Sequence, residues 1–220
     1  MHSRGFIKMI GYILFDVAGT LLEKPGLFAA IQQACRESGH PRSIGEIRTK
    51  HKMLSEISRF PDRTGPTFYR RFNRELLYLL GIVPSTVLVE AIIKKCGKLT
   101  WQPFPDTTLL SDLPVPMGVI SNFNATLRGK LKKSFGGIFR HVLVSEEEGL
   151  AKPSVRFYAQ ALQRIPLPPE RVLYIGDSLK LDYEPASRLG FRALLLDRNN
   201  FYPNLGNKIS NLREIRRFVT

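Results

Sequence analysis

Short apolar runs recur along the chain and predict the strands of a sheet. They cover residues 10–14, 115–120, 142–144, 172–175 and 193–197. Each run is short and bounded by turn residues, as is typical of buried strands. From residue 101 onward the strand patterns alternate with helical ones, which favours right-handed crossovers and a parallel sheet. The pattern therefore predicts an α/β fold.

The segment between the first two strands has a different periodicity. From about residue 25 to residue 97, apolar positions recur at helical spacing and no run resembles a strand. Helices are expected over residues 26–38, 43–57, 67–80 and 85–98. These four helices either form a bundle of their own or pack on the sheet. At the other end of the chain, residues 202–206 are expected to form a loop and residues 210–218 a basic surface helix.

Polar residues follow each of the first four predicted strands, and their types differ from one strand to the next. Because the carboxyl ends of parallel strands are where α/β sheets bind ligands, these side chains are expected to lie close together. Helix capping or turn formation is the competing interpretation for each of them. A carboxylate, a hydroxyl-amide pair, an ammonium and paired carboxylates together suit one phosphate and one divalent metal ion. The residues are Asp16, Ser121, Asn122, Lys152, Asp177 and Asp182.

These residues lie in four short segments whose order resembles the haloacid dehalogenase (HAD) superfamily. The segments are residues 16–20, 121–122, 152–153 and 176–182. The resemblance covers nearly the whole chain. It implies an α/β fold with a Rossmann-like parallel sheet core and an inserted four-helix cap domain. The core would comprise residues 1–22 and 102–220, and the α-helical cap domain residues 23–101.

The resemblance also implies a chemistry, that of a Mg²⁺-dependent hydrolase, most simply a phosphatase for a small phosphorylated metabolite. Asp16 would be the nucleophile and would form an aspartyl-phosphate. Asp16, Asp177 and the backbone carbonyl of Ala18 would bind Mg²⁺, with Asp182 in support. Lys152 would balance the negative charge and contact phosphate. Thr20, Ser121 and Asn122 would donate hydrogen bonds to the phosphate oxygens.

Ala18 departs from the pattern of most phosphatases in this superfamily, which carry an acid/base Asp there. General acid–base catalysis typically contributes ~10²–10⁴-fold, so alanine implies a good leaving group, another acid, or a different reaction. Phosphonoacetaldehyde hydrolases share the alanine and cleave a C–P bond through a cap lysine, for which Lys50 and Lys52 are the candidates. A catalytically weak phosphate-binding protein is a further alternative. The paired Asp177 and Asp182 argue against a metal-free dehalogenase.

Composition and net charge indicate which kinds of partner this chain can bind. The net charge of +14 favours anionic ligands, but the basic residues are scattered, so we expect a small phosphorylated or phosphonate substrate and no specific nucleic acid. No apolar run is long enough to span a bilayer, so we expect no membrane partner. Cys35 and Cys96 both fall in helical patterns, which favours reduced thiols and a cytoplasmic protein. The substrate and the oligomeric state stay open.

Overall fold

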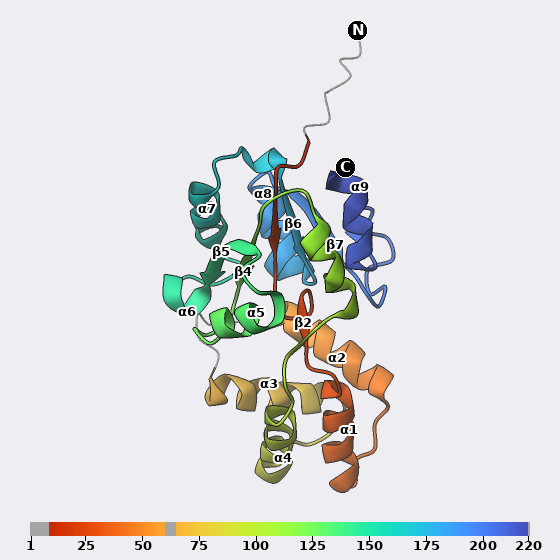
Figure 1. Ribbon diagram of the computed structural model, residues 1–220. Coiled ribbons are helices and arrows are strands. Elements are labelled where there is room, and N and C mark those ends of the chain that lie inside the picture. The colour runs from red at the N-terminus through yellow and green to blue at the C-terminus, as the bar shows by residue number, and fades with distance from the viewer. Residues whose placement is uncertain (1–8, 60–64, 220) are drawn as a thin grey trace.

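A six-stranded parallel sheet organises the computed structural model, which describes residues 9–59 and 65–219 (Figure 1). The strand order is β5-β4-β1-β6-β7-β8, and each neighbouring pair is parallel. This confirms the predicted α/β class and the parallel sheet. The strands are β1 (Tyr12–Phe15), β4 (Met117–Ser121), β5 (Phe139–Val144), β6 (Val172–Gly176), β7 (Arg192–Leu196) and β8 (Lys208–Ile209).

Helical segments cover both faces of this sheet. Alternate residues of a strand point to opposite faces, so Ile13 and Phe15 join one apolar cluster while Tyr12 and Leu14 join another. The first cluster packs against α5 (Leu127–Phe135), η1 (Pro105–Asp112), η4 (Leu212–Ile215) and α9 (Arg216–Val219). The second packs against α7 (Val155–Arg164) and α8 (Glu184–Arg188). The short segments α6 (Ser145–Glu148), η2 (Pro169–Arg171) and η3 (Leu179–Tyr183) complete this part of the chain.

Four helices occupy the described residues of the insertion between β1 and β4, within two residues of the predicted bounds. They are α1 (Leu27–Glu37), α2 (Ile44–Ile57), α3 (Pro66–Leu79) and α4 (Thr86–Gly97). Ser43 and Ser85 cap the N-termini of α2 and α4, because each hydroxyl accepts a hydrogen bond from a backbone N–H of the first turn. The four helices share an apolar cluster of their own, with Ile31, Ile47, Leu76 and Ile92 almost fully buried. Of the two arrangements left open by periodicity, the bundle is the one observed.

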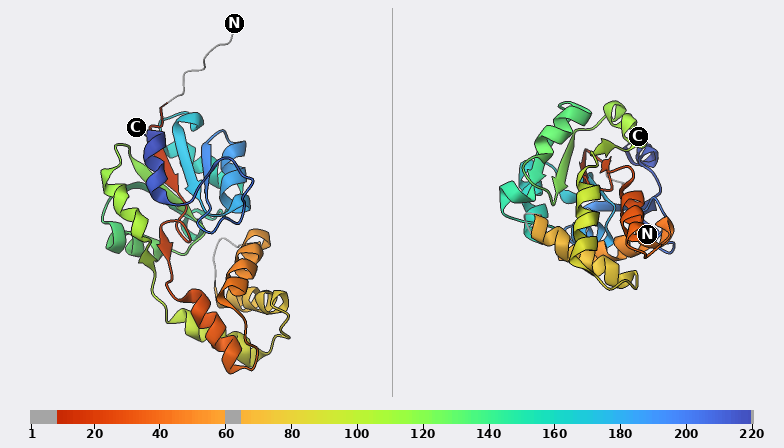
Figure 2. Two further views of the ribbon diagram at one scale, coloured as in Figure 1. Left: turned by 90° about the vertical axis from the view of Figure 1, so that its right-hand side faces the viewer. Right: turned by 90° about the horizontal axis from the view of Figure 1, so that it is seen from below.

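Two linkers join the insertion to the sheet unit. They pair as short antiparallel strands, β2 (Leu22–Glu23) and β3 (Gln102–Pro103). The sequence patterns predict no strands here, because two residues are too few to show a period. The insertion lies beyond the end of the sheet where β1 runs out into its loop (Figures 1 and 2). Polar residues at the carboxyl ends of the strands therefore face the inserted helices.

The carboxyl-terminal segment is helical with exposed arginines, as predicted, but it also has a buried side. After β8 the chain forms η4 and α9, and Leu212 and Ile215 are buried in the cluster on one sheet face. These two apolar residues, three positions apart, pack on the sheet while the arginines between and after them face outward. Among the described residues no helix has both the length and the apolarity that a membrane span requires.

Candidate active site

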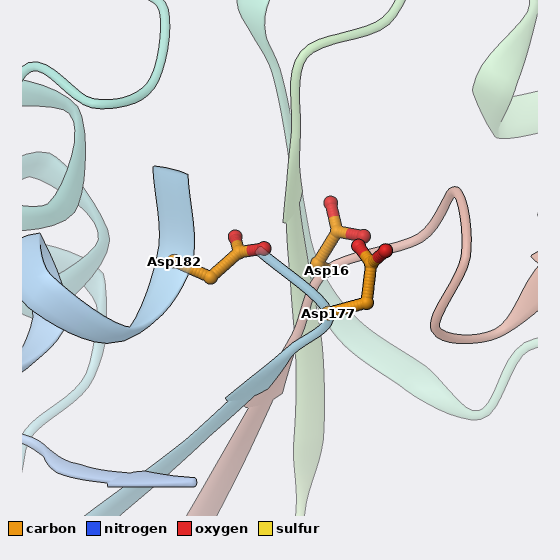
Figure 3. A group of neighbouring side chains, drawn as sticks. All are labelled: Asp16, Asp177 and Asp182. Carbon is orange, nitrogen blue, oxygen red and sulfur yellow. The ribbon is translucent and has the colours of Figure 1, made fainter. Parts of the chain in front are cut away.

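Three carboxylates meet at the carboxyl end of the central strands. Strands β1 and β6 pair with Phe15 opposite Ile175, so Asp16 and Asp177 emerge side by side. Asp182 follows on η3, whose turn folds back toward β6. One carboxylate oxygen of each residue lies within 4.8 Å of one from each of the others (Figure 3). Asp16 and Asp182 are buried, whereas the Asp177 side chain is 31% exposed.

Lys152 joins two of these carboxylates. Its Nζ donates to Asp16 Oδ1 at 2.6 Å and to Asp182 Oδ1 at 2.6 Å, and the lysine side chain is only 3% exposed. Burial alone would lower the pKa of Lys152, but the two carboxylates raise it above its usual range, so the ammonium stays charged. Burial raises the pKa of Asp16 to about 7, against the opposing attraction of Lys152. A further cation near Asp16 would lower that pKa.

Two glycines allow the carboxylates to approach. Gly19 has φ +90°, and a Cβ on it would lie 2.7 Å from Asp177 Oδ2. A Cβ on Gly176 would lie 2.3 Å from Asp182 Cγ. Real Cβ atoms do not approach heavy atoms so closely, so both positions need glycine if the side chains are to keep these places.

The structure gives Asn122 a contact that its position in the sequence did not suggest. Its Oδ1 accepts from the Lys152 backbone N–H at 2.7 Å, and its Nδ2 donates to the Lys152 carbonyl at 3.0 Å. The amide thus holds the backbone of the lysine loop. Ser121 ends β4 and is buried, as is Thr20, whose Oγ1 forms no hydrogen bond with the described residues. Phosphate contacts of these three residues stay predictions.

Comparison with known proteins places this geometry in a family. A family model for haloacid dehalogenase-like hydrolases matches residues 10–190, which include every carboxylate and the lysine described above. The chain belongs to this family. HAD-like hydrolases that resemble it include the glyceraldehyde 3-phosphate phosphatase of Methanocaldococcus jannaschii, 36% identical over 194 residues that cover 83% of this chain and 82% of that protein.

Two further HAD proteins extend the comparison. Haloacid dehalogenase-like hydrolase domain-containing protein 3 of Danio rerio is 28% identical and covers 87% of this chain and 86% of its own. Among solved structures, the HAD hydrolase YfnB of Bacillus subtilis, bound to magnesium, matches with a TM-score of 0.70 and 21% identity. The match covers 96% of this chain and 99% of YfnB. At that identity the likeness concerns the fold.

Helix α2 brings a second lysine to the cluster of carboxylates. Lys52 Nζ lies 2.5 Å from the Asp177 carbonyl oxygen, 3.3 Å from Asp177 Oδ2 and 2.8 Å from Glu56 Oε1. Burial alone would lower the pKa of Lys52, but the carboxylates of Asp177 and Glu56 raise it above its usual range. A Schiff base needs a neutral amine, so this environment argues against C–P cleavage through Lys52. Lys50 lies half-buried on the same helix.

Two residues that contact the carboxylate cluster could not be predicted from the polar residues that follow the strands. The Tyr174 hydroxyl donates to Asp182 Oδ1 at 2.8 Å, and the Glu56 carboxylate accepts from the loop after Asp177. Tyr174 looks like any apolar strand residue in the sequence. Glu56 lies four residues after Lys52, which suggests a helical ion pair but not its contact with the core.

The donor set fits a hard divalent cation. Asp16 and Asp177 present carboxylate oxygens to each other, and the buried Asp16 Oδ2 has no hydrogen-bond partner among the described residues. Oxygen ligands of this kind suit Mg²⁺. Burial raises the pKa of Asp177, against the attraction of Lys52, and the neighbouring carboxylates of Asp182 and Glu56 raise it further. A cation bound by Asp16 and Asp177 would offset this concentration of negative charge.

Proposed function

We propose that this HAD-like hydrolase is a Mg²⁺-dependent phosphatase for a small phosphorylated metabolite. The observation that carries the proposal is the carboxylate cluster of Asp16, Asp177 and Asp182 with Lys152 buried among them. The phosphatase name of the archaeal relative supports this reaction class. Residues 23–101 are proposed as a cap domain over a core formed by residues 1–22 and 102–220, because the inserted helices have a separate apolar cluster.

Asp16 is the proposed nucleophile. An oxygen of its carboxylate attacks phosphorus, the bond from phosphorus to the leaving oxygen breaks, and an aspartyl-phosphate forms. Water then attacks that phosphorus, releases inorganic phosphate and restores the carboxylate. Lys152, held by Asn122 through its backbone, keeps Asp16 Oδ1 oriented and offsets negative charge as the phosphate binds.

Asp16, Asp177 and the Ala18 carbonyl are the residues that would hold Mg²⁺. When bound, the ion supplies positive charge that offsets the carboxylates and the phosphate oxygens. Asp182 accepts from Lys152, Tyr174 and the Ser178 backbone N–H, so its proposed role is to orient the lysine. Thr20 and Ser121 supply hydroxyls at the same end of the sheet for phosphate oxygens.

Ala18 limits the substrates of the proposed enzyme. An alanine methyl group can neither protonate a leaving oxygen nor activate water. Substrates whose leaving group needs little protonation are therefore expected to react best. Lys52, held charged between Asp177 and Glu56, gives no support to the phosphonate alternative.

A phosphate-release assay tests the proposal. The panel should contain glyceraldehyde 3-phosphate, other sugar phosphates, nucleotides, acyl phosphates, nitrophenyl phosphate and phosphonoacetaldehyde. We expect phosphate release that stops with chelator and returns with Mg²⁺. Full activity in excess chelator would contradict the metal requirement. Phosphate binding without turnover of any compound would favour a catalytically weak phosphate-binding protein.

A further inference from the structure

Glu56 is a carboxylate of the inserted helix α2 that accepts three hydrogen bonds from the sheet unit. Its Oε2 accepts from Ser178 Oγ at 2.8 Å and from the Lys180 backbone N–H at 3.1 Å. Its Oε1 accepts from the Leu179 backbone N–H at 3.1 Å. The residue is only 6% exposed, although most glutamates lie at the surface. The hydrogen bonds from residues 178–180 stabilise the buried negative charge of Glu56.

The loop that Glu56 contacts carries the site carboxylates on either side. Residues 178–181 connect Asp177 to Asp182, and η3 begins at Leu179. Amide N–H groups in the first turn of a helical segment have no partner within it, and here two of them donate to a side chain from a distant part of the sequence. Bonds of this kind to an ionised carboxylate are stronger than neutral ones. The conformation of the loop therefore depends on α2.

Lys52 reinforces the same contact from one turn earlier on α2. Its Nζ bridges Glu56 Oε1 at 2.8 Å and the Asp177 carbonyl oxygen at 2.5 Å. The two α2 side chains together contact four consecutive residues, Asp177 to Lys180. Glu56 is thus bonded to the loop directly and to Asp177 through Lys52.

We infer that Glu56 is a positioning residue for Asp177 and Asp182, so that the affinity of the carboxylate cluster for a divalent cation depends on the docking of α2. The inference rests on the metal site of the proposed function. Partners that orient metal ligands without touching the metal commonly contribute about 10- to 100-fold to metal affinity. Glu56 would do so from the insertion, outside the four segments that carry the resemblance to the family.

Amide hydrogen exchange tests the positioning without any metal. The full chain is compared as wild type, Glu56→Gln and Glu46→Gln. Glu46 is a matched control because it lies on the same helix, is exposed and has Arg42 as its ion-pair partner. We expect faster exchange at Leu179 and Lys180 in Glu56→Gln only. Unchanged exchange there would overturn the inference.

Mn²⁺ binding, followed by electron paramagnetic resonance, tests the consequence for the metal. Glu56→Gln should bind Mn²⁺ about 10- to 100-fold more weakly than wild type, and Glu46→Gln should match wild type. Ser178→Ala removes one donor to Glu56 and should weaken binding less, which keeps the test available if Glu56→Gln folds poorly. A purely structural role would lower thermal stability without moving the Mn²⁺ affinity.

The outcomes separate the two proposals. Tight Mn²⁺ binding by wild type with equal affinity in Glu56→Gln would overturn the inference and leave the proposed function intact. Absence of Mn²⁺ binding in wild type would contradict the proposed metal site, and with it the metal-affinity part of the inference. The exchange experiment would still decide whether Glu56 holds the loop.

Discussion

Two lysines of this protein lie between carboxylates, and the two arrangements are built differently. Lys152 contacts Asp16 and Asp182, both from the sheet unit, and its side chain is 3% exposed. Lys52 contacts Glu56 on its own helix and Asp177 on the sheet unit, and is 12% exposed. The first arrangement is formed entirely within the sheet unit, whereas the second exists only while α2 is docked. Similar chemistry thus depends on the sheet in one case and on packing between two units in the other.

The largest expected effect lies in the sheet-built site. Asp16→Asn should reduce turnover by at least about 10³-fold, because an amide cannot attack phosphorus. Folding should persist, since Lys152 keeps Asp182 as a partner. Steady-state kinetics and thermal unfolding measure the two effects, with Asp112→Asn, an exposed acidic residue, as the control. Near-normal turnover in Asp16→Asn would remove this residue as the nucleophile.

Replacing each lysine by methionine compares the two arrangements directly. Lys152→Met leaves two buried carboxylates without their cation and should cost about 3–5 kcal/mol of unfolding free energy. Lys52→Met should cost less, about 1–2 kcal/mol, because Glu56 keeps its donors in residues 178–180. Urea unfolding gives both values, and Lys94→Met, at an exposed lysine of the insertion, is the control. Equal losses at the two positions would break the distinction drawn above.

Ala18→Asp tests the missing acid at the sheet end. The wild type should hydrolyse nitrophenyl or acyl phosphates far faster than alkyl phosphates, with a steep dependence of rate on leaving-group pKa. The new carboxylate should flatten that dependence and raise alkyl phosphate hydrolysis by up to ~10²-fold. The slope is the main readout, because it depends less on how well the carboxylate is placed. A wild-type rate independent of leaving-group pKa, with dephosphorylation shown not to limit it, would point to another proton donor.

The smallest expected effect is a pH dependence confined to the inserted helices. Burial lowers the pKa of His51 to about 4, with Lys52 contributing, and its ring lies 5.5 and 5.0 Å from the rings of Phe28 and Phe72. The unfolded chain, with a pKa near 6.5, therefore binds the proton first as pH falls. Stability from neutral His51 is complete above about pH 6.5 and is lost between there and about pH 4.

The loss expected from His51 is about 1–2 kcal/mol after allowance for its partial exposure. The free energy of unfolding is measured with urea at pH 7 and at pH 4.5 for wild type and for His51→Gln. The contribution of His51 is the amount by which the wild type loses more of this free energy than the variant does. His40→Gln, an exposed histidine of the insertion, serves as the control. A pH dependence that is identical in wild type and His51→Gln would show that this histidine titrates normally.

Much of the fold was predictable because its signals are local. Short continuous apolar runs and helical spacing depend only on residues close together in the sequence, so the main strands and the four inserted helices were predicted close to their observed bounds. The paired linkers and β8, each two residues long, have no period to detect. The last segment is helical as predicted, but the burial of Leu212 and Ile215 was not predicted, because it depends on the sheet face beneath them.

The sequence by itself determined which functional groups stand at the ends of the strands, since Asp16, Ser121, Lys152 and Asp177 each follow an apolar run. Only the tertiary structure decided how these groups are paired. Lys152 bonds to Asp16, 136 residues away, and Glu56 to Ser178, 122 residues away. Such pairs depend on which strands become neighbours and where α2 docks. Long-range packing and the need to compensate buried charge determine these pairings, and local periodicity contains no information on either.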